Sequence, residues 1–253
     1  MAKEGRGYPP EGLFEEQPAA EFQGTFPGNP PIVDEKLITG EVETDVLVLG
    51  GGHAGLHTAL AACEGGARVA VVERRTEEKM TWIGEQIGTF NSRFLTARGF
   101  GGYNLDDIIE EFDRCAVYRN NHRLIEKYVR NSGEALDHLL SLIPKDSDIL
   151  DPDQYNIHQA YGNPTYPITR GGYRTWAATI QFRGKVVDTR DIDYPIGKFS
   201  RLKDICKIVL KRTQELGAEW YFGRRVVLLT QDEKGAVTGA LAKNQDGSYT
   251  RFI

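Results

Sequence analysis

The stretch that decides the fold is residues 45–73, which read DVLVLGGGHAGLHTALAACEGGARVAVVE. It contains an apolar run at 46–49, a group of glycines, an apolar segment from Ala54 to Ala62 and a second apolar run at 69–72. Near-continuous apolar strands joined by a helix are typical of a parallel sheet that is covered on both faces. We therefore predict a strand-helix-strand unit and an α/β fold.

The glycines between the first strand and the helix fit the pattern G-x-G-x-x-G. In this context the first glycine makes a tight turn, the second lets the backbone approach a pyrophosphate, and the third lets the helix pack on the strand. The N–H groups and the positive end of the helix then face the phosphates. The expected contacts of a dinucleotide in this turn are Gly50, Gly52, His53, Ala54 and Gly55.

The second strand ends in Glu73, about twenty residues past the glycines, where a carboxylate can accept hydrogen bonds from the ribose hydroxyls of an adenosine. A carboxylate at this place disfavours a 2′-phosphate, so NADP is not expected. We include the adjacent Arg74 in the predicted site. The motif itself does not distinguish NAD from FAD.

Two parts of the chain resemble the fumarate reductase/succinate dehydrogenase flavoprotein family: VETDVLVLGGGHAGLHTALAACEGGARVAVVER at 42–74 and EWYFGRRVVLLTQDEKGAVTGALAKNQDGSYTRFI at 219–253. The resemblance implies FAD as the cofactor. It also implies a glutathione-reductase-like FAD-binding Rossmann domain, with a parallel sheet, helices and a β-meander. The activity it implies is hydride transfer between the flavin and a small organic substrate, such as an unsaturated carboxylate or enone. Val226 and Val227 are carried over as contacts of the adenine.

The loop that should approach the flavin departs from the family pattern. The family has a Gly-Gly-Asn/Ser-Thr loop after the acidic residue, whereas this chain has KMTWIGEQIGTFNSRF at 79–94. The remaining small or polar matches are Gly84, Gly88 and Asn91, and we place the last two in the site. Trp82 either packs in the core, which is the commoner role, or lies against a ring system, and Glu85 or Gln86 could reach a flavin edge.

In that family the catalytic residues lie in segments that come later in the chain than the two matched here. No catalytic residue is therefore assigned. We expect the chain to be the N-terminal part of such a flavoprotein, incomplete at its C-terminus. Two alternatives stay open. The chain could be a non-catalytic FAD-binding or partner-binding subunit that a second polypeptide completes, or a NAD-dependent oxidoreductase with the same motif.

The predicted organisation has an extended arm at 1–36, rich in Pro and Gly, followed by one FAD-binding domain at 37–253. Within the domain we expect helices at about 104–143 with Asn104 and Asn121 as N-caps, irregular loops at about 144–199, and a helix that starts after Ser200 and ends at Gly217. A β-meander is expected at 219–253. Its strands are predicted at Glu219–Leu229, Ala236–Lys243 and Tyr249–Ile253.

Composition excludes several classes of protein. The formal net charge is -5, and without clustered positive charge we expect no nucleic acid as a partner. No apolar run approaches the length of a membrane span, and the three cysteines form no CxxC pair, so the cytoplasm is the expected compartment. No metal is expected, because His53 and His57 share a helix face but have no third ligand.

Two further patterns resemble functional sites. Tyr194 and Lys198 have the spacing of a dehydrogenase acid-base pair, but Pro195 and Gly197 between them disfavour the helix that this pair needs. Several arginines lie among aromatic residues in the irregular segment and could bind an anionic or planar substrate, although solvated arginines are the commoner case. They are Arg170, Arg174, Arg183 and Arg190.

Overall fold

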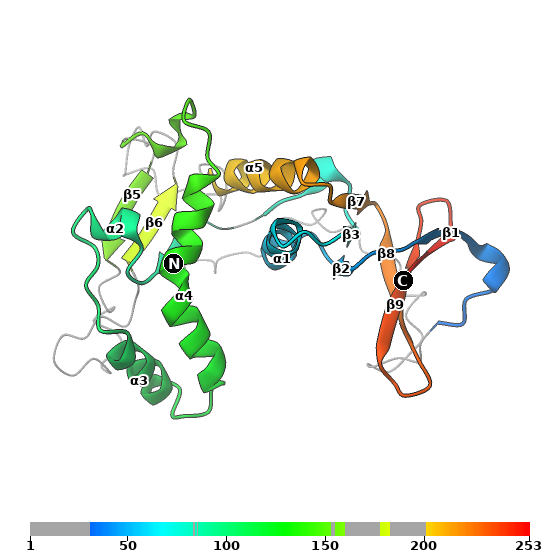
Figure 1. The fold of residues 1–253 in the computed structure, drawn as a ribbon, viewed down its shortest axis with the longest axis horizontal. Helices are drawn as coiled ribbons and strands as arrows, with labels where there is room; N and C mark the ends of the chain where they lie inside the picture. The colour runs from blue at the N-terminus through cyan, green and yellow to red at the C-terminus, as the bar shows by residue number, and fades with distance from the viewer. Residues whose placement is uncertain (1–30, 83, 85, 153–154, 160–177, 183–200) are drawn as a thin grey trace, which may run out of the picture. The chain divides into compact units, whose positions relative to one another are not determined.

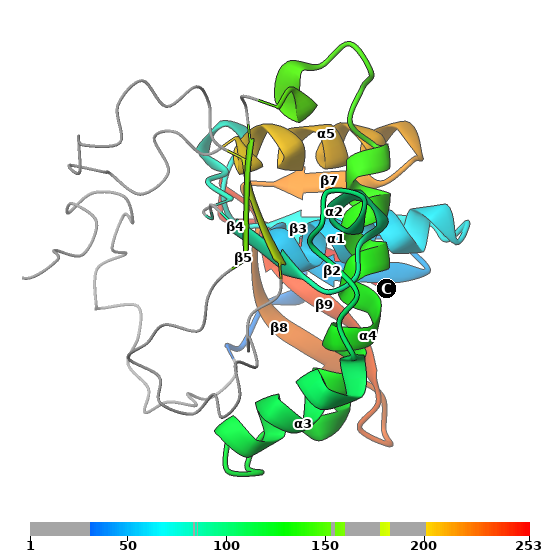
Figure 2. The same cartoon turned by 90° about the vertical axis from the view of Figure 1, so that its left-hand side faces the viewer.

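The computed structural model describes residues 31–82, 84, 86–152, 155–159, 178–182 and 201–253. They belong to two compact units, which are described separately. One contains residues 31–42 and Arg225–Ile253, and the other lies within Glu43–Arg224. Figure 1 labels most of the helices and strands, and Figure 2 shows them from a second direction.

The larger unit contains a three-stranded parallel sheet in the order β2-β3-β7. β2 (Val46–Leu49) and β7 (Glu219–Phe222) both pair in parallel with β3 (Val69–Glu73), which lies between them. Helix α1 (His53–Glu64) joins β2 to β3, and α5 (Leu202–Glu215) precedes β7. The two helices contact each other. The predicted strand-helix-strand unit is therefore confirmed.

Burial explains why these segments form sheet and helix. The first four residues of β3 are all buried, as expected for a central parallel strand. The buried residues of α1 recur at helical spacing along one face, which is the face that packs in the core. They are Leu56, Ala59, Leu60 and Cys63.

The segment predicted to be helical contains α3 (Leu105–Cys115) and α4 (His122–Ser141). Both predicted N-caps are confirmed: the Asn104 side chain accepts from the N–H of Asp106, and that of Asn121 accepts from the N–H of Leu124. The described part of this unit also contains three shorter helices. They are η3 (Glu77–Lys79), α2 (Arg93–Thr96) and η4 (Asp148–Leu150).

A second sheet of this unit is antiparallel, with strands in the order β4-β6-β5. Its strands are β4 (Gln86–Thr89), β5 (Tyr155–Gln159) and β6 (Ala178–Phe182). Helix α4 contacts β4 and α2. A Cβ on Gly133 of α4 would lie 2.3 Å from the carbonyl oxygen of Phe90, so the helix packs directly on the backbone that follows β4.

The smaller unit is a four-stranded sheet in the order β1-β10-β9-β8. β8 (Arg225–Gln231), β9 (Val237–Lys243) and β10 (Tyr249–Phe252) form the antiparallel meander, and β1 (Ile38–Val42) adds to it in parallel beside β10. The short helix η2 (Glu35–Leu37) precedes β1. Strand β1 was not predicted from the sequence.

The structure corrects two element boundaries. The strand predicted at Glu219–Leu229 is two strands, because Gly223 at φ +69° separates β7 of the parallel sheet from β8. The meander therefore begins at Arg225 and not at 219. Helix α5 begins after Arg201, whose side chain makes no capping hydrogen bond, and its predicted end is confirmed by Gly217 at φ +97°.

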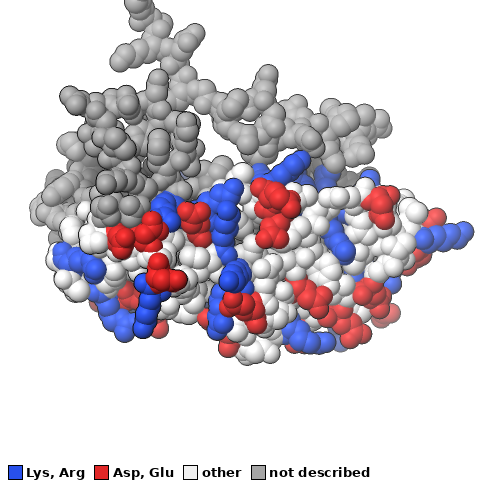
Figure 3. All heavy atoms as spheres, turned by 90° about the horizontal axis from the view of Figure 1, so that it is seen from above, with Lys and Arg blue, Asp and Glu red and all other residues white. Residues whose placement is uncertain are grey.

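Among the described residues, no helix combines the length and the apolar character that a bilayer crossing requires. All three cysteines are free thiols. On the face shown in Figure 3, the Lys and Arg side chains of the described residues are interspersed with Asp and Glu.

Candidate functional site

The turn between β2 and α1 holds the glycine motif, and its first glycine is required by conformation. Gly50 has a φ of +96°, in the left-handed region that glycine adopts without strain. Its N–H donates to the carbonyl oxygen of Val72 on β3 at 2.8 Å. Gly50 thus makes the tight turn at the end of β2.

Gly55 and Gly51 are required by packing. A Cβ on Gly55 would lie 1.9 Å from the carbonyl oxygen of Gly50, and a Cβ on Gly51 would lie 2.7 Å from the ring of Trp220. The start of α1 is therefore in close backbone contact with the end of β2, which is the helix packing expected of the third glycine of the motif.

Gly52 differs, because neither conformation nor packing requires a glycine there. Its φ is -65° and a Cβ would meet no atom within 4 Å. Gly52 is the exposed N-cap of α1 and contributes no side-chain hydrogen bond to the helix start. The helix N-terminus favours an anion, and a glycine at this place leaves room for one to approach the backbone.

Glu73, at the end of β3, has both carboxylate oxygens fixed by backbone donors. Oε2 accepts from the N–H of Gly51 at 2.7 Å and Oε1 accepts from the N–H of Arg75 at 2.8 Å. A carboxylate oxygen can accept two hydrogen bonds, so each can also accept one from a ribose hydroxyl. These two hydrogen bonds hold the half-buried carboxylate in one orientation at the end of β3.

His53 begins α1 and contacts the neighbouring helix α5. Its Nδ1 lies 3.5 Å from Sγ of the buried Cys206. Burial raises the pKa of the Cys206 thiol to about 12, so the thiol keeps its proton at neutral pH and can donate it to Nδ1.

A cavity of about 210 Å³ lies at this end of the sheet. Its lining residues are Gly52, His53, Glu73, Arg75, Met80, Thr81 and Trp82. The structure thus brings three of the predicted residues together. Arg75, which follows the end of β3, was missed in favour of the exposed Arg74. The side chain of Arg75 donates to Thr81 Oγ1 at 3.0 Å.

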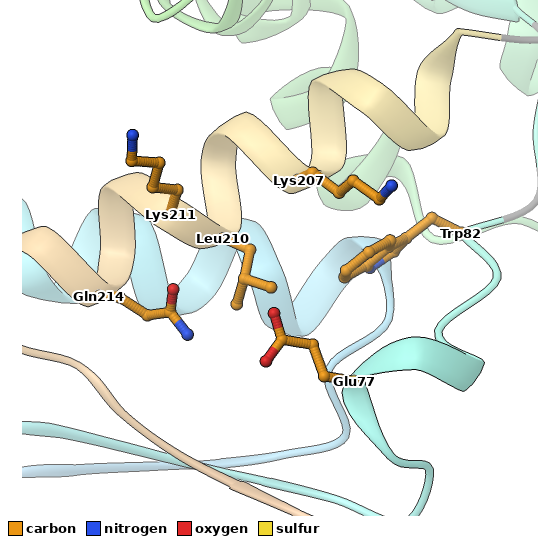
Figure 4. Close-up of a pocket in the computed structure, with 6 residues that line it drawn as sticks. All are labelled: Glu77, Trp82, Lys207, Leu210, Lys211 and Gln214. Carbon is orange, nitrogen blue, oxygen red and sulfur yellow. The ribbon is translucent and has the colours of Figure 1, made fainter.

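Trp82 also lines a second cavity, of about 310 Å³, beside α5. Its other lining residues are Glu77, Lys207, Leu210, Lys211 and Gln214. Figure 4 shows the Trp82 indole facing the α5 side chains Lys207 and Leu210, with Glu77 of η3 below them. No feature of the sequence had indicated this cavity.

The other predicted site residues do not line the 210 Å³ cavity. Ala54 is exposed on α1. Gly88 lies on β4, where its carbonyl accepts from the Tyr128 hydroxyl at 3.0 Å. The side-chain amide of Asn91 is engaged with the backbone of Tyr103, donating to its carbonyl and accepting from its N–H, both at 2.9 Å.

Val226 and Val227 belong to β8 of the smaller unit, where the register with β9 shifts between Val226 and Leu228. Several other predictions fall outside the described residues: Glu85, the Tyr194–Lys198 pair and the four arginines Arg170, Arg174, Arg183 and Arg190. The side chain of Gln86 is likewise not described.

A glycine turn into a helix N-terminus, beside a carboxylate at the end of the next parallel strand, defines a dinucleotide-binding α/β protein. The chain belongs to the FAD binding domain family, whose model matches residues 45–253. This match confirms FAD as the cofactor and the FAD-binding Rossmann fold. The residues present fit FAD, because Gly52 leaves space at the helix start and Glu73 can accept from a ribose.

Solved structures with the same fold include 3-ketosteroid-Δ4-(5α)-dehydrogenase from Rhodococcus jostii RHA1, with a TM-score of 0.63 and 19% identity. They also include a flavocytochrome c3 fumarate reductase, with a TM-score of 0.58 and 20% identity, and a variant of E. coli quinol fumarate reductase, with a TM-score of 0.59 and 12% identity. The matches cover 88%, 85% and 85% of this chain in that order. The predicted resemblance to the fumarate reductase flavoproteins is confirmed.

The chain spans only part of these proteins: 46% of the ketosteroid dehydrogenase and 32% of each fumarate reductase. A search of the curated proteins found no match.

Proposed function

We propose that this chain binds the ADP half of FAD at the carboxyl ends of β2 and β3 and belongs to an oxidoreductase that acts on a small organic molecule. The single observation that supports the site is the open space around Gly52. Gly50 is explained by its positive φ and Gly55 by its contact with Gly50, whereas Gly52 has open space around it. Close approach of a ligand is the remaining physical reason for a glycine at the helix start.

In the proposed binding mode, the backbone at the start of α1 meets the pyrophosphate and the Glu73 carboxylate accepts from the ribose. Gly50 and Gly55 shape the turn, and His53 and Arg75 border the same cavity. Bound FAD would supply the transfer of a hydride to or from carbon. No residue of this chain is assigned a catalytic role.

For the substrate we propose an unsaturated carboxylate or an enone. The support is that proteins of this fold include a ketosteroid dehydrogenase in complex with 4-androstene-3,17-dione and fumarate reductases. We propose the cytoplasm as the compartment, because three free thiols suit a reducing environment.

A second candidate is a subunit that requires another polypeptide to complete the flavin and substrate site. The observation in its favour is that the similar solved structures include the Mycobacterium smegmatis Sdh1 complex. Such a subunit would bind FAD firmly only in the presence of its partner.

The test is to purify the chain, record its absorbance spectrum and identify the released nucleotide by mass spectrometry. We expect FAD, and we expect Gly52→Ala to weaken its binding at least tenfold because the new methyl group occupies the space of the phosphates (about 1.4 kcal/mol per factor of ten). Glu73→Ala should also weaken FAD binding. Bound nicotinamide without flavin, or unchanged affinity in both variants, would contradict the proposed site.

A further inference from the structure

The backbone of Gly51 is held from both sides by side chains. Its N–H donates to Glu73 Oε2 at 2.7 Å, and its carbonyl oxygen accepts from the indole Nε1–H of Trp82 at 2.9 Å. Glu73 comes from the end of β3 and Trp82 from the loop beyond η3. The middle of the phosphate loop is therefore anchored to both structures that follow α1 in the chain.

Fixing the carbonyl of Gly51 also fixes the N–H of Gly52. The two groups belong to one planar peptide unit, and in the trans form they point in opposite directions. Since the Gly51 carbonyl points at the Trp82 indole, the Gly52 N–H points away from it. Gly52 is exposed and lines the 210 Å³ cavity, so this N–H is the backbone donor whose direction the indole sets.

Trp82 is itself held in an unusual way. Only 6% of the residue is exposed, and its φ is +25°, a conformation that side-chain-bearing residues rarely adopt. Such a backbone costs about 1–3 kcal/mol and persists when its surroundings enforce it. A buried indole N–H needs an acceptor, and the acceptor of Trp82 is a backbone carbonyl of the phosphate loop.

We propose that Trp82 is a positioning residue for FAD binding: its indole N–H holds the Gly51–Gly52 peptide so that the Gly52 N–H meets a phosphate of the cofactor. This inference rests on the proposed function, because it assumes that FAD occupies the cavity at Gly52. Trp82 acts through the backbone, whereas Glu73 acts on the ribose by direct contact.

Ligands with and without phosphates can separate the contact of the Gly52 N–H with a phosphate from the contact of Glu73 with the ribose. Trp82→Phe removes the indole donor and keeps an aromatic ring in the core. FAD and ADP carry the pyrophosphate and adenosine does not, so the variant should weaken FAD and ADP about tenfold, the scale of losing one hydrogen bond to a charged group. Adenosine binding should stay within about twofold of wild type, because Glu73 is unchanged.

Thr213→Val provides a matched control. Thr213 Oγ1 accepts from the indole N–H of Trp220 at 3.0 Å, so this variant also breaks one indole hydrogen bond in the same unit. It should lower thermal stability and leave the affinities for FAD, ADP and adenosine unchanged.

Calorimetric titrations of the wild-type chain and both variants test the inference. Unchanged ADP and FAD affinity in Trp82→Phe would overturn the inference, and so would an equal loss for ADP and adenosine, which would show general damage to the site. A wild-type chain that binds neither FAD nor ADP would overturn the proposed function, and this inference with it.

Discussion

Replacing Gly55 by alanine should destabilise the larger unit even in the absence of any ligand. The new Cβ would lie 1.9 Å from the carbonyl oxygen of Gly50 and 3.2 Å from a methyl group of Val48. Contacts under 3.0 Å essentially never occur at a real Cβ, so α1 and the end of β2 must separate by about 1 Å. The nearest obstacle is backbone, which cannot rotate away as a side chain could.

The magnitude follows from two opposing effects. Overpacking of a well-packed site costs up to about 3 kcal/mol. Alanine is a better helix former than glycine and returns about 1 kcal/mol. The net loss is then about 2 kcal/mol, which lowers Tm by about 4–8 °C for a protein of this size.

The assay is thermal unfolding of the ligand-free protein, followed by tryptophan fluorescence. Trp82 and Trp220 both lie in the unit that contains α1, so the signal reports on the packing in question. Gly52→Ala is the matched control, because its Cβ meets nothing within 4 Å and replacing glycine by alanine at an N-cap costs about 0.5 kcal/mol. A Tm for Gly55→Ala equal to or above that of wild type would refute the close packing of α1 on the turn.

Three further outcomes are expected. Gly133→Ala should lower the free energy of unfolding in urea by about 2 kcal/mol, because the new Cβ would lie 2.3 Å from the carbonyl oxygen of Phe90. An unchanged free energy of unfolding would contradict the packing of α4 on that backbone. A thiol-reactive reagent should modify the half-buried Cys115 before the buried Cys63 and Cys206. The fast phase of the modification reaction should disappear in Cys115→Ser, and a fast phase that persists in this variant would contradict the predicted order of reactivity. Hydrogen bonds from the Arg68 side chain and backbone lower the pKa of Asp45 to about 2, below its usual value of about 3.9. The stabilisation of the folded state by this pair is therefore present above about pH 4 and is lost as the pH falls toward 2. The difference in urea midpoint between wild type and Asp45→Asn should shrink across that range, and an equal difference at pH 3 and pH 6 would show the explanation to be wrong.

The strand-helix-strand unit could be predicted because its signals are local. Apolar runs, glycines at fixed spacing and caps such as Asn104 and Asn121 act over a few residues, and the structure confirms all of these elements. The break at Gly223 was missed because β7 and β8 follow closely in the chain, and the sheet that each strand joins depends on tertiary pairing.

The contacts that complete the candidate site were harder to predict, because they depend on tertiary structure. The hydrogen bond from Trp82 to Gly51 joins residues 31 positions apart and leaves no periodic trace in the sequence. Cys206 reaches His53 across 153 positions for the same reason. The resemblance to flavoproteins directed attention to Asn91, whose amide is engaged with Tyr103.

The pairing of β1 with β10 has a consequence for how the chain acquires its structure during synthesis. Ile38 pairs with Tyr249, so the edge of β1 that bonds to β10 has no partner until residue 249 has left the ribosome. The segments of β2, α1 and β3 lie close together in sequence and can assemble much earlier. We therefore expect the nucleotide-binding turn to form on the nascent chain before β10 has been synthesised and can pair with β1.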